Sequence, residues 1–356
     1  MQQPQITISR ALIPSNSVID DEGEKTYYYD RLMKSWTGTK NRKLPQLGSN
    51  PVSLSRQNLK DLRNGDYVVG LKSDGIRYIL YLCLRKDGSP VSLMVDRAQN
   101  MYEVEVVAQE EYFTTETIFE GELVWSQPDE TSLLFLMFDV VRLKGESMTN
   151  RPFIQRIEAV ERCTRLSDEI SLIGDLDEME SRVSETGSIV IMKFNPRLIV
   201  RPKRFVAIEH TIPVWEARAE AQHRVDGLVI QRSDAPYKNG SAYNTIYKWK
   251  PEHSVDLSGG HYGLCHAGGT IDEDIFHNRK IVVLPSRVTV SSNSEVAEYH
   301  LDTNTPGEVR LFAMRTRPDK KKPNSAAVIK ATIQDCIENI QPNDISDAAS
   351  SMDETQ

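Results

Sequence analysis

Runs of β-branched and aromatic residues recur through most of the chain and predict strands. Two of them, YVVGL (67–71) and RYILYLCLR (77–85), stand on either side of the polar sequence KSDGI. Further strands are predicted at 91–96, 117–125, 132–143, 188–194, 225–232 and 245–251. Turn sequences such as KDGS and QPDET separate successive runs, which is typical of hairpins, so the pattern predicts a largely antiparallel sheet.

Helical periodicity is confined to a few segments. Apolar residues spaced by three and four predict a helix over 151–167 and a final helix over 324–340, which starts at the cap-like PNS and carries a stripe of isoleucines. A shorter helical pattern begins at Ser55. Strands and helices together predict an α+β protein.

The pattern of elements also suggests where the domains divide. After DLSGGHYG (256–263) the strands become short, and we place the boundary just before this segment. The expected domains are 1–251, whose residues 1–26 are polar and loosely ordered, and 252–340, which ends with the last helix. Residues 341–356 are acidic and are expected to form a disordered tail. A chain of 356 residues suits two domains of ordinary size.

Charge and hydropathy narrow the classes of protein. The formal net charge of −8 argues against a protein that coats nucleic acid non-specifically, because that mode needs a broad excess of Lys and Arg. One segment, RTRPDKKK (315–322), is strongly basic and is a candidate contact for a polyanion. No run approaches the roughly 18 apolar residues of a membrane span, and the N-terminus lacks the layout of a signal peptide, so we expect an intracellular protein.

The cysteines give no sign of a disulfide or a structural metal. All four are far apart and none belongs to a CxxC pair, which favours reduced thiols: Cys83, Cys163, Cys265 and Cys336. The sequence HYGLCH offers three possible ligands, His261, Cys265 and His266, but no second pair to complete a zinc site.

Lys72 stands at the exit of a hydrophobic strand, beside Asp74, Gly75 and Arg77. An unperturbed lysine has a pKa of about 10.4, so about one molecule in 10³ carries a neutral amine at neutral pH. Making the amine neutral costs about 4 kcal/mol unless burial or nearby cations lower that pKa. Two cations are available in YKWKP, where Lys248 and Lys250 alternate and so face one side of a strand. The alternative reading is that KSDG is only a solvated turn.

Six short sequences follow one another in a distinctive order: KSDGIR, FEGELV, FDVV, VDGLVI, KWKP and RPDKKKPN. This order resembles the covalent nucleotidyltransferase superfamily, which comprises mRNA capping guanylyltransferases and polynucleotide ligases. GSNPVSLSRQNL, VDRAQNMY and the closing R-x-D-K-x-x-P-N are most similar to the capping guanylyltransferases. The resemblance covers about residues 44–330 and implies a nucleotidyltransferase domain of antiparallel sheets and helices, followed by a C-terminal OB-fold β-barrel.

The resemblance implies that Lys72 attacks the α-phosphate of GTP, which gives a lysyl–GMP and pyrophosphate. The GMP then passes to the 5′-diphosphate end of an RNA to make the GpppN cap. The resemblance also implies that Arg77 and Arg97 contact the ribose and phosphates. Glu122 would contact the ribose or metal-bound water, and Phe138 would stack on the guanine.

Further roles come from the same resemblance. Asp226 and Asp256 would hold Mg²⁺ or Mn²⁺, and Lys248 and Lys250 would grip the α-phosphate. Asp256 departs from the family pattern, because the loop before it is shorter than usual. Lys193 stands where the family tends to place a guanine-reading lysine.

The closing segment carries a last group of residues. Arg317, Asp319 and Lys320 would lie on the OB fold and orient the β- and γ-phosphates when the cleft closes.

Several of these residues have a purely structural alternative. Glu122 and Asp226 could cap turns at strand ends, and Phe138 could belong to the core. Arg97 could be a surface ion-pair partner, and the lysines at 320–322 a solvated patch.

Two other functions stay open. An ATP-dependent DNA or RNA ligase would use the same Lys72 to carry AMP, and a non-catalytic OB-containing RNA-binding module would carry no nucleotide. No sequence typical of an RNA triphosphatase or a methyltransferase is present, so separate proteins would supply those steps, with RNA from an RNA polymerase. We expect a monomer in the nucleus of a cell, or in the viral factory or virion of a large DNA virus.

Overall fold

The computed structural model describes residues 17–38, 47–63, 66–128, 132–165, 176–192, 197–259, 264–286, 288, 295–318 and 320–350. The chain divides into two compact units, Met1–Val52 with Asn64–Lys248 and Ser53–Arg63 with Trp249–Gln356. The chain passes from the first unit to the second after Lys248, close to the boundary that we expected at 251. Ser53–Arg63, which we assigned to the first domain, is part of the second unit.

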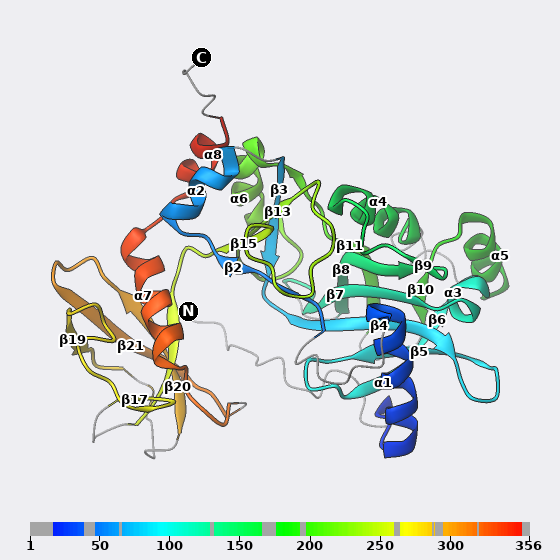
Figure 1. The fold of residues 1–356 in the computed structure, drawn as a ribbon, viewed down its shortest axis with the longest axis horizontal. Helices are drawn as coiled ribbons and strands as arrows, with labels where there is room; N and C mark the ends of the chain where they lie inside the picture. Colours follow the sequence, from blue (N-terminus) through cyan, green and yellow to red (C-terminus); the bar gives the residue numbers. More distant parts are fainter. Residues whose placement is uncertain are drawn as a thin grey trace. The chain divides into compact units, whose positions relative to one another are not determined.

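An eight-stranded sheet forms the body of the first unit (Figure 1). Its strands run in the order β10-β6-β5-β4-β7-β8-β11, with β9 beside β8, and all neighbours are antiparallel except β8 and β11. The strands are β4 (Ile76–Leu84), β5 (Pro90–Val95), β6 (Met101–Val107), β7 (Thr117–Trp125), β8 (Ser132–Leu143), β9 (Glu146–Ser147), β10 (Val190–Met192) and β11 (Arg197–Pro202). The predicted antiparallel sheet is therefore confirmed.

Helices cover both faces of this sheet. Alternation along β4 sends Leu80 into a core shared with Phe153 of α4 (Phe153–Cys163), and Tyr81 into a second core shared with Leu32 of α1 (Glu22–Thr37). The Asp21 side chain accepts from the backbone of Glu24 and so caps α1. The predicted helix over 151–167 is present as α4. The other helices of this unit are α3 (Glu111–Thr114), α5 (Leu176–Thr186) and α6 (Thr211–Glu216), with 3-10 turns η4 (Ile208–His210) and η5 (Ala217–Glu220) among the described residues.

A smaller sheet has the strand order β12-β3-β13-β15-β2. Its strands are β2 (Val52–Ser53), β3 (Tyr67–Ser73), β12 (Val206–Ala207), β13 (Val225–Arg232) and β15 (Ile246–Trp249), and β1 (Ser49–Asn50) pairs separately with β14 (Gly240–Ser241). β3 and β13 are antiparallel neighbours. The strand that carries Lys72 is therefore an interior strand of this sheet, between β12 and β13.

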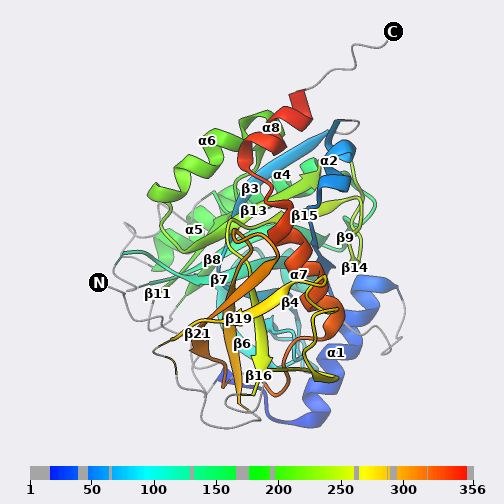
Figure 2. The ribbon, with the colours of Figure 1, turned by 90° about the vertical axis from the view of Figure 1, so that its left-hand side faces the viewer.

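The second unit is a six-stranded sheet in the order β18-β17-β16-β20-β21-β19. Its elements are β16 (Ser254–Ser258), β17 (Cys265–His266), β18 (Gly269–Thr270), β19 (Lys280–Val283), β20 (Val296–Asp302), β21 (Glu308–Thr316), α2 (Arg56–Arg63), α7 (Ala326–Glu338) and α8 (Pro342–Ser350). Helix α7 lies along the sheet, and its Ile329 and Ile333 are buried in the core of this unit (Figure 2). The sheet is consistent with the expected OB fold. Ser325 caps α7, as the cap-like PNS predicted.

The prediction of a disordered tail is wrong for Pro342–Ser350, which form α8. Ile345 and Ala348 lie about one turn apart and are both buried, which gives the helix an apolar face. Trp249 Nε1 donates a 2.7 Å hydrogen bond to the carbonyl of Ile340 just before α8. Residues 351–356 of the predicted tail lie outside the described residues. Within the described part of the chain, none of the helices has the length and apolar character needed to cross a bilayer.

Candidate active site

Lys72 lies near the end of β3 and forms an ion pair with Asp226. Its Nζ donates to Asp226 Oδ1 at 2.7 Å, and the two side chains are 20% and 23% exposed. In the ladder of β3 and β13, Val225 lies opposite Ser73 and Gly227 opposite Lys72, so Asp226 is the extra residue of a β-bulge. Bulges re-aim side chains near functional sites. This bulge brings the Asp226 carboxylate to the lysine.

The close approach of β7 to residue 75 explains why KSDGIR has a glycine at this position. A Cβ at this position would lie 2.4 Å from the carbonyl oxygen of Leu123 and 2.9 Å from Cγ of Glu122. Because of this close approach, the chain passes from β3 to β4 directly over β7 only if residue 75 has no side chain. The Asp74 amide donates to the carbonyl of Arg224 at 2.9 Å, which ties the same turn to the start of β13.

Arg77, on β4, points into a buried polar cluster. Its guanidinium bonds Glu120 and the carbonyl of Ser49, and the hydroxyl of Tyr237 donates to Glu120 Oε2 at 2.9 Å. Glu120 is fully buried and Arg77 is 11% exposed. Burial raises the pKa of the Glu120 carboxyl, and the charge of Arg77 opposes that shift. Sequence reasoning missed Glu120, although it is the first acid of FEGELV.

Phe138 is half-buried and lies between two cations. The Arg77 Cζ is 5.5 Å from the centre of its ring, and Lys203 Nζ is 5.9 Å from it. The register of β7 and β8 shifts here, since Gly121 pairs with Met137 and Glu120 with Asp139, which leaves Phe138 as the extra residue. The ring is therefore partly exposed and lies beside positive charge, which suits a residue that stacks on a base.

Lys203 is a second residue that sequence reasoning missed. It follows edge strand β11, is only 8% exposed, and places Nζ 3.6 Å from Glu122 Oε2. Burial lowers the pKa of the Lys203 ammonium, and the charge of Lys72 lowers it further, whereas Glu122 and Asp226 raise it. One signal in the sequence is a lysine directly after the apolar run LIV in RLIVRPK, a run that we did not predict to be a strand. Lys203 thus links the Lys72–Asp226 pair to Glu122 and Phe138.

A buried ion pair holds the residue next to Phe138. Arg156 of α4 is 1% exposed and binds Asp139 in bidentate fashion, with Nε 2.7 Å from Oδ1 and Nη2 3.0 Å from Oδ2. Its Nη1 donates to the carbonyls of Arg151 and Ala235. The Arg156–Asp139 ion pair therefore holds the backbone next to Phe138 in place.

Arg97 lies just after β5 and is exposed. It lines a hollow of only about 20 Å³ together with Arg77, Asp96 and Gln99. Among the described residues, no ion pair involves Arg97. Within the described residues, Arg97 thus lacks the ion pair that the structural alternative requires. Its side chain lines the same hollow as Arg77.

A cavity of about 690 Å³ adjoins this cluster, between β3, β8 and the α6–η5 segment. Its walls are more apolar than polar and are formed in part by Leu71, Leu134, Leu136, Ser73, Lys203 and His223. Mostly apolar pockets with a few convergent polar groups are the usual form of small-molecule sites. Ser73 and Lys203 connect the cavity to the surroundings of Lys72.

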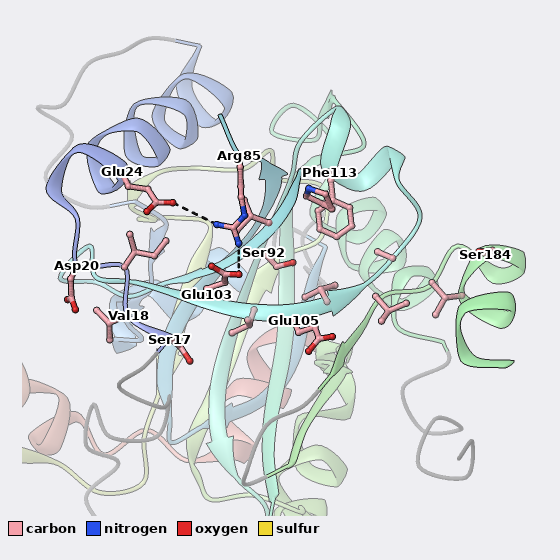
Figure 3. A pocket seen from close by; sticks show the side chains of 18 residues that line it. Ser17, Val18, Asp20, Glu24, Arg85, Ser92, Glu103, Glu105, Phe113 and Ser184 are labelled. Carbon is pink, nitrogen blue, oxygen red and sulfur yellow. Dashed lines mark hydrogen bonds and ion pairs between the residues drawn. The ribbon is translucent and has the colours of Figure 1, made fainter. Parts of the chain in front are cut away.

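A larger cavity of the first unit lies elsewhere (Figure 3). It measures about 990 Å³ and is lined by β5, β6 and the segment before α1. Among the described residues that line it, the one cation is Arg85, which forms ion pairs with Glu24 and Glu103, and the figure draws it between these carboxylates. None of the predicted site residues that the structure describes lines this cavity, so cavity size alone does not locate the chemistry.

Arg317 and Lys320 of the second unit both bind Asp256. Arg317 Nη1 is 3.0 Å from Asp256 Oδ1 and 3.7 Å from Glu298 Oε2, and Lys320 Nζ bonds Asp256 Oδ2. The Asp256 amide also donates to Asn324 Oδ1 at 2.7 Å. The closing segment is thereby tied to β16 through Asp256.

The remaining predicted residues divide between the units. Lys248 lies in β15 at the end of the first unit, and Lys250 belongs to the second, and both are half-buried. Lys193 and Asp319 lie outside the described residues, as does His261. Among the described residues, no group of three His, Cys, Asp or Glu side chains is placed to hold a metal ion. In the first unit, the structure brings together Lys72, Arg77, Glu122, Phe138 and Asp226.

Comparison with known proteins points to one family. The family model "mRNA capping enzyme, catalytic domain" matches residues 9–252. The mRNA-capping enzyme of Caenorhabditis elegans is 26% identical over 258 residues, which are 69% of this chain and 38% of that protein. The mRNA-capping enzyme subunit alpha of Neurospora crassa is 34% identical over 229 residues, which are 59% of this chain and 52% of that protein. The chain thus spans about half the length of these relatives or less.

A solved structure is also similar. A mycobacterial DNA ligase D, complexed with ATP and MES, matches with a TM-score of 0.44 and 13% identity, over 79% of this chain and 97% of that one. This likeness does not bear on which nucleotide the chain uses.

Proposed function

Because the chain belongs to the mRNA capping enzyme catalytic-domain family, we propose that it is an mRNA guanylyltransferase that works through a covalent lysyl–GMP on Lys72. In the first step the Lys72 amine attacks the α-phosphorus of GTP. A nitrogen–phosphorus bond forms, the bond from the α-phosphorus to the bridging oxygen breaks, and pyrophosphate leaves. In the second step an oxygen of an RNA 5′-diphosphate attacks the same phosphorus, and the Lys72 nitrogen leaves as the amine.

The single observation that carries this proposal is the ion pair of Lys72 with Asp226 in the bulge of β13, at 2.7 Å. A nucleophilic lysine must be held in place and must lose a proton. The Lys72 amine donates a hydrogen bond to Asp226, so this carboxylate is the nearest acceptor for the proton that Lys72 must lose. The structural alternative, in which Asp226 only caps a turn, does not account for this contact.

The surroundings supply the rest of a nucleotide site. Phe138 would stack on the guanine, and Lys203 and the adjoining cavity would receive the edge of the base. Arg77 and Arg97 would contact the ribose and phosphates, and Lys248 and Lys250 the α-phosphate. Lys193 stays a prediction from the resemblance, and Lys203 is the lysine whose geometry supports a contact with the base.

A divalent metal, Mg²⁺ or Mn²⁺, is implied by the family. Carboxylate oxygens are the ligands that these ions prefer, and Asp226 and Glu122 fit, because the lysines that they pair with could bind the nucleotide phosphates and leave the carboxylate oxygens to the ion. Bound there, the ion would neutralise charge that develops on the phosphates. Asp256 fits less well, because both of its carboxylate oxygens are engaged by Arg317 and Lys320.

Arg317, Asp319 and Lys320 would orient the β- and γ-phosphates of GTP during the first step. Phosphoryl transfer needs positive charge held in line with the leaving group, and a basic segment that exchanges Asp256 for phosphate would meet that need.

The proposal is tested by incubating the full chain with divalent metal and either α-labelled GTP or α-labelled ATP. We expect acid-labile, base-stable label on the protein from GTP alone, and none with Lys72→Ala. Lys86→Ala is a matched control, because Lys86 is exposed in the turn between β4 and β5. Label from ATP alone would mean a ligase, and absence of label from both would favour the RNA-binding module.

The second step has its own assay. Adding RNA that ends in a 5′-diphosphate should move the label from protein to RNA as GpppN. RNA polymerase, a separate RNA triphosphatase and a cap methyltransferase are the partners this function implies, with a monomer acting in a nucleus, a viral factory or a virion.

A further inference from the structure

His223 is anchored to the residue that follows Lys72. Its Nε2 lies 3.0 Å from the hydroxyl oxygen of Ser73, and the adjoining Arg224 carbonyl accepts from the Asp74 amide at 2.9 Å. Ser73 is fully buried, whereas His223 is half-buried and lines the 690 Å³ cavity. The imidazole therefore has a fixed position in the wall of that cavity, which Lys203 also lines.

The charge and tautomer of this ring follow from its neighbours. Burial and the nearby charge of Lys203 lower the pKa of His223 to about 4, so the ring is neutral at pH 7. The buried Ser73 hydroxyl has no other acceptor among the described residues, so its proton points to Nε2. In a neutral imidazole the other nitrogen then carries the hydrogen. Nδ1–H is thus a donor, and it has no acceptor within the described residues.

Guanine and adenine differ in what they offer to such a donor. At C6, guanine presents an oxygen that accepts hydrogen bonds, whereas adenine presents an amino group that donates. Lys203, which lines the same cavity, is also a donor. Two fixed donors could both hydrogen-bond to the guanine oxygen. The adenine amino group would face two other donors and make no hydrogen bond to them, and sites of this kind discriminate strongly.

We propose that His223 is a specificity-determining residue that donates from Nδ1 to O6 of the guanine, with Ser73 as the positioning residue that fixes its tautomer. This inference rests on the proposed function. It assigns the choice of GTP over ATP partly to a side chain that lies outside FEGELV, FDVV and KWKP.

The test compares two nucleotides that differ at the C6 substituent. GTP and the triphosphate of 2,6-diaminopurine riboside are assayed for lysyl–nucleotide formation with the full chain and with His223→Ala. We expect His223→Ala to lower kcat/KM for GTP by about tenfold, the effect of one hydrogen bond, and to leave the diaminopurine nucleotide unchanged. An equal loss for both nucleotides, or none for GTP, would overturn the proposal.

Two further variants separate positioning from folding. Ser73→Ala should reduce the preference for GTP in the same direction, and Ser73→Thr, which keeps the hydroxyl, should retain it. If Ser73→Ala kept the full preference, the positioning role would be wrong. His210→Ala removes an exposed imidazole from η4 and is the matched control. If the wild-type chain forms no lysyl–GMP, the proposed function fails before this test begins.

Discussion

Lys72 and Asp226 form an ion pair of 2.7 Å although they are not partners in the β3–β13 ladder, where Lys72 lies opposite Gly227. Without the bulge, the next residue along β13 would carry its side chain to the other face of the sheet. The bulge thus decides whether the nucleophile has a carboxylate beside it.

Asp226→Asn is therefore expected to slow lysyl–GMP formation by about 10²-fold or more, because the amide keeps the shape but cannot take the proton. The melting temperature should change little, since a partly exposed pair contributes about 1 kcal/mol or less. Asp234→Asn, an exposed aspartate just after the same strand, is the control and should keep full activity. An unchanged rate in Asp226→Asn would contradict the role of Asp226.

Gly75→Ala is expected to impair both folding and labelling. Its Cβ would meet the Leu123 carbonyl at 2.4 Å, and backbone atoms cannot move aside as a flexible side chain can. Overpacking of this kind costs about 1–3 kcal/mol, which urea unfolding measures. Gly88→Ala is the comparison, because a Cβ there meets nothing within 4 Å and the cost is only that of its positive φ of 88°. Equal costs at the two positions would rule out the steric explanation.

Arg156→Ala is expected to destabilise the first unit by about 3–5 kcal/mol, because it leaves the buried Asp139 carboxylate without its bidentate partner. The matched variant is Arg232→Ala, which breaks an exposed Arg–Asp pair with Asp234 and should cost about 1 kcal/mol or less. Both are measured as the free energy of unfolding in urea. A cost for Arg156→Ala as small as that of the control would show that the pair is dispensable.

Asp256→Asn tests whether Asp256 ties down the closing segment or holds a metal. If it ties the segment, the variant should be cut by trypsin after Lys320 about tenfold faster, because the charged hydrogen bonds of Asp256 to Arg317 and Lys320 are weakened. The Mg²⁺ concentration for half-maximal labelling should stay the same. The opposite pattern, with unchanged cleavage and a higher Mg²⁺ requirement, would favour metal binding.

The strands of the large sheet could be predicted because their side chains alternate between two cores, which is a local property of the sequence. Leu80 and Tyr81 illustrate it, since neighbours on β4 belong to different cores. Helix α8 was missed because the acidic composition of the tail concealed the spacing of Ile345 and Ala348. Their burial is a tertiary effect that composition does not report.

The candidate site could be predicted where short motifs carry it and not where distant segments meet. Lys72, Arg77 and Glu122 stand in recognisable sequences. Lys203 does not, and it reaches Glu122 because β11 runs parallel to β8 at the edge of the sheet, a pairing that local sequence does not specify. His223 is likewise distant in sequence from Ser73, and only the fold joins them.

His223 also predicts how stability depends on pH. The folded state holds its pKa at about 4, below the ordinary value of 6.5, so the unfolded chain binds a proton that the folded chain does not between these values. Stability is therefore unaffected above about pH 6.5 and falls as the pH drops toward 4. The ring is partly exposed, and solvent screening limits the loss to about 1 kcal/mol.

The measurement is the free energy of unfolding at pH 7 and pH 5, for the wild-type chain and for His223→Gln. We expect the variant to lose less stability between the two pH values, because it has no imidazole to protonate. His253, whose pKa burial also lowers to about 4, serves as the second site, and His253→Gln should act in the same direction. The exposed His210 is the control. A slope that His223→Gln leaves unchanged would mean that the imidazole is not held neutral in the fold.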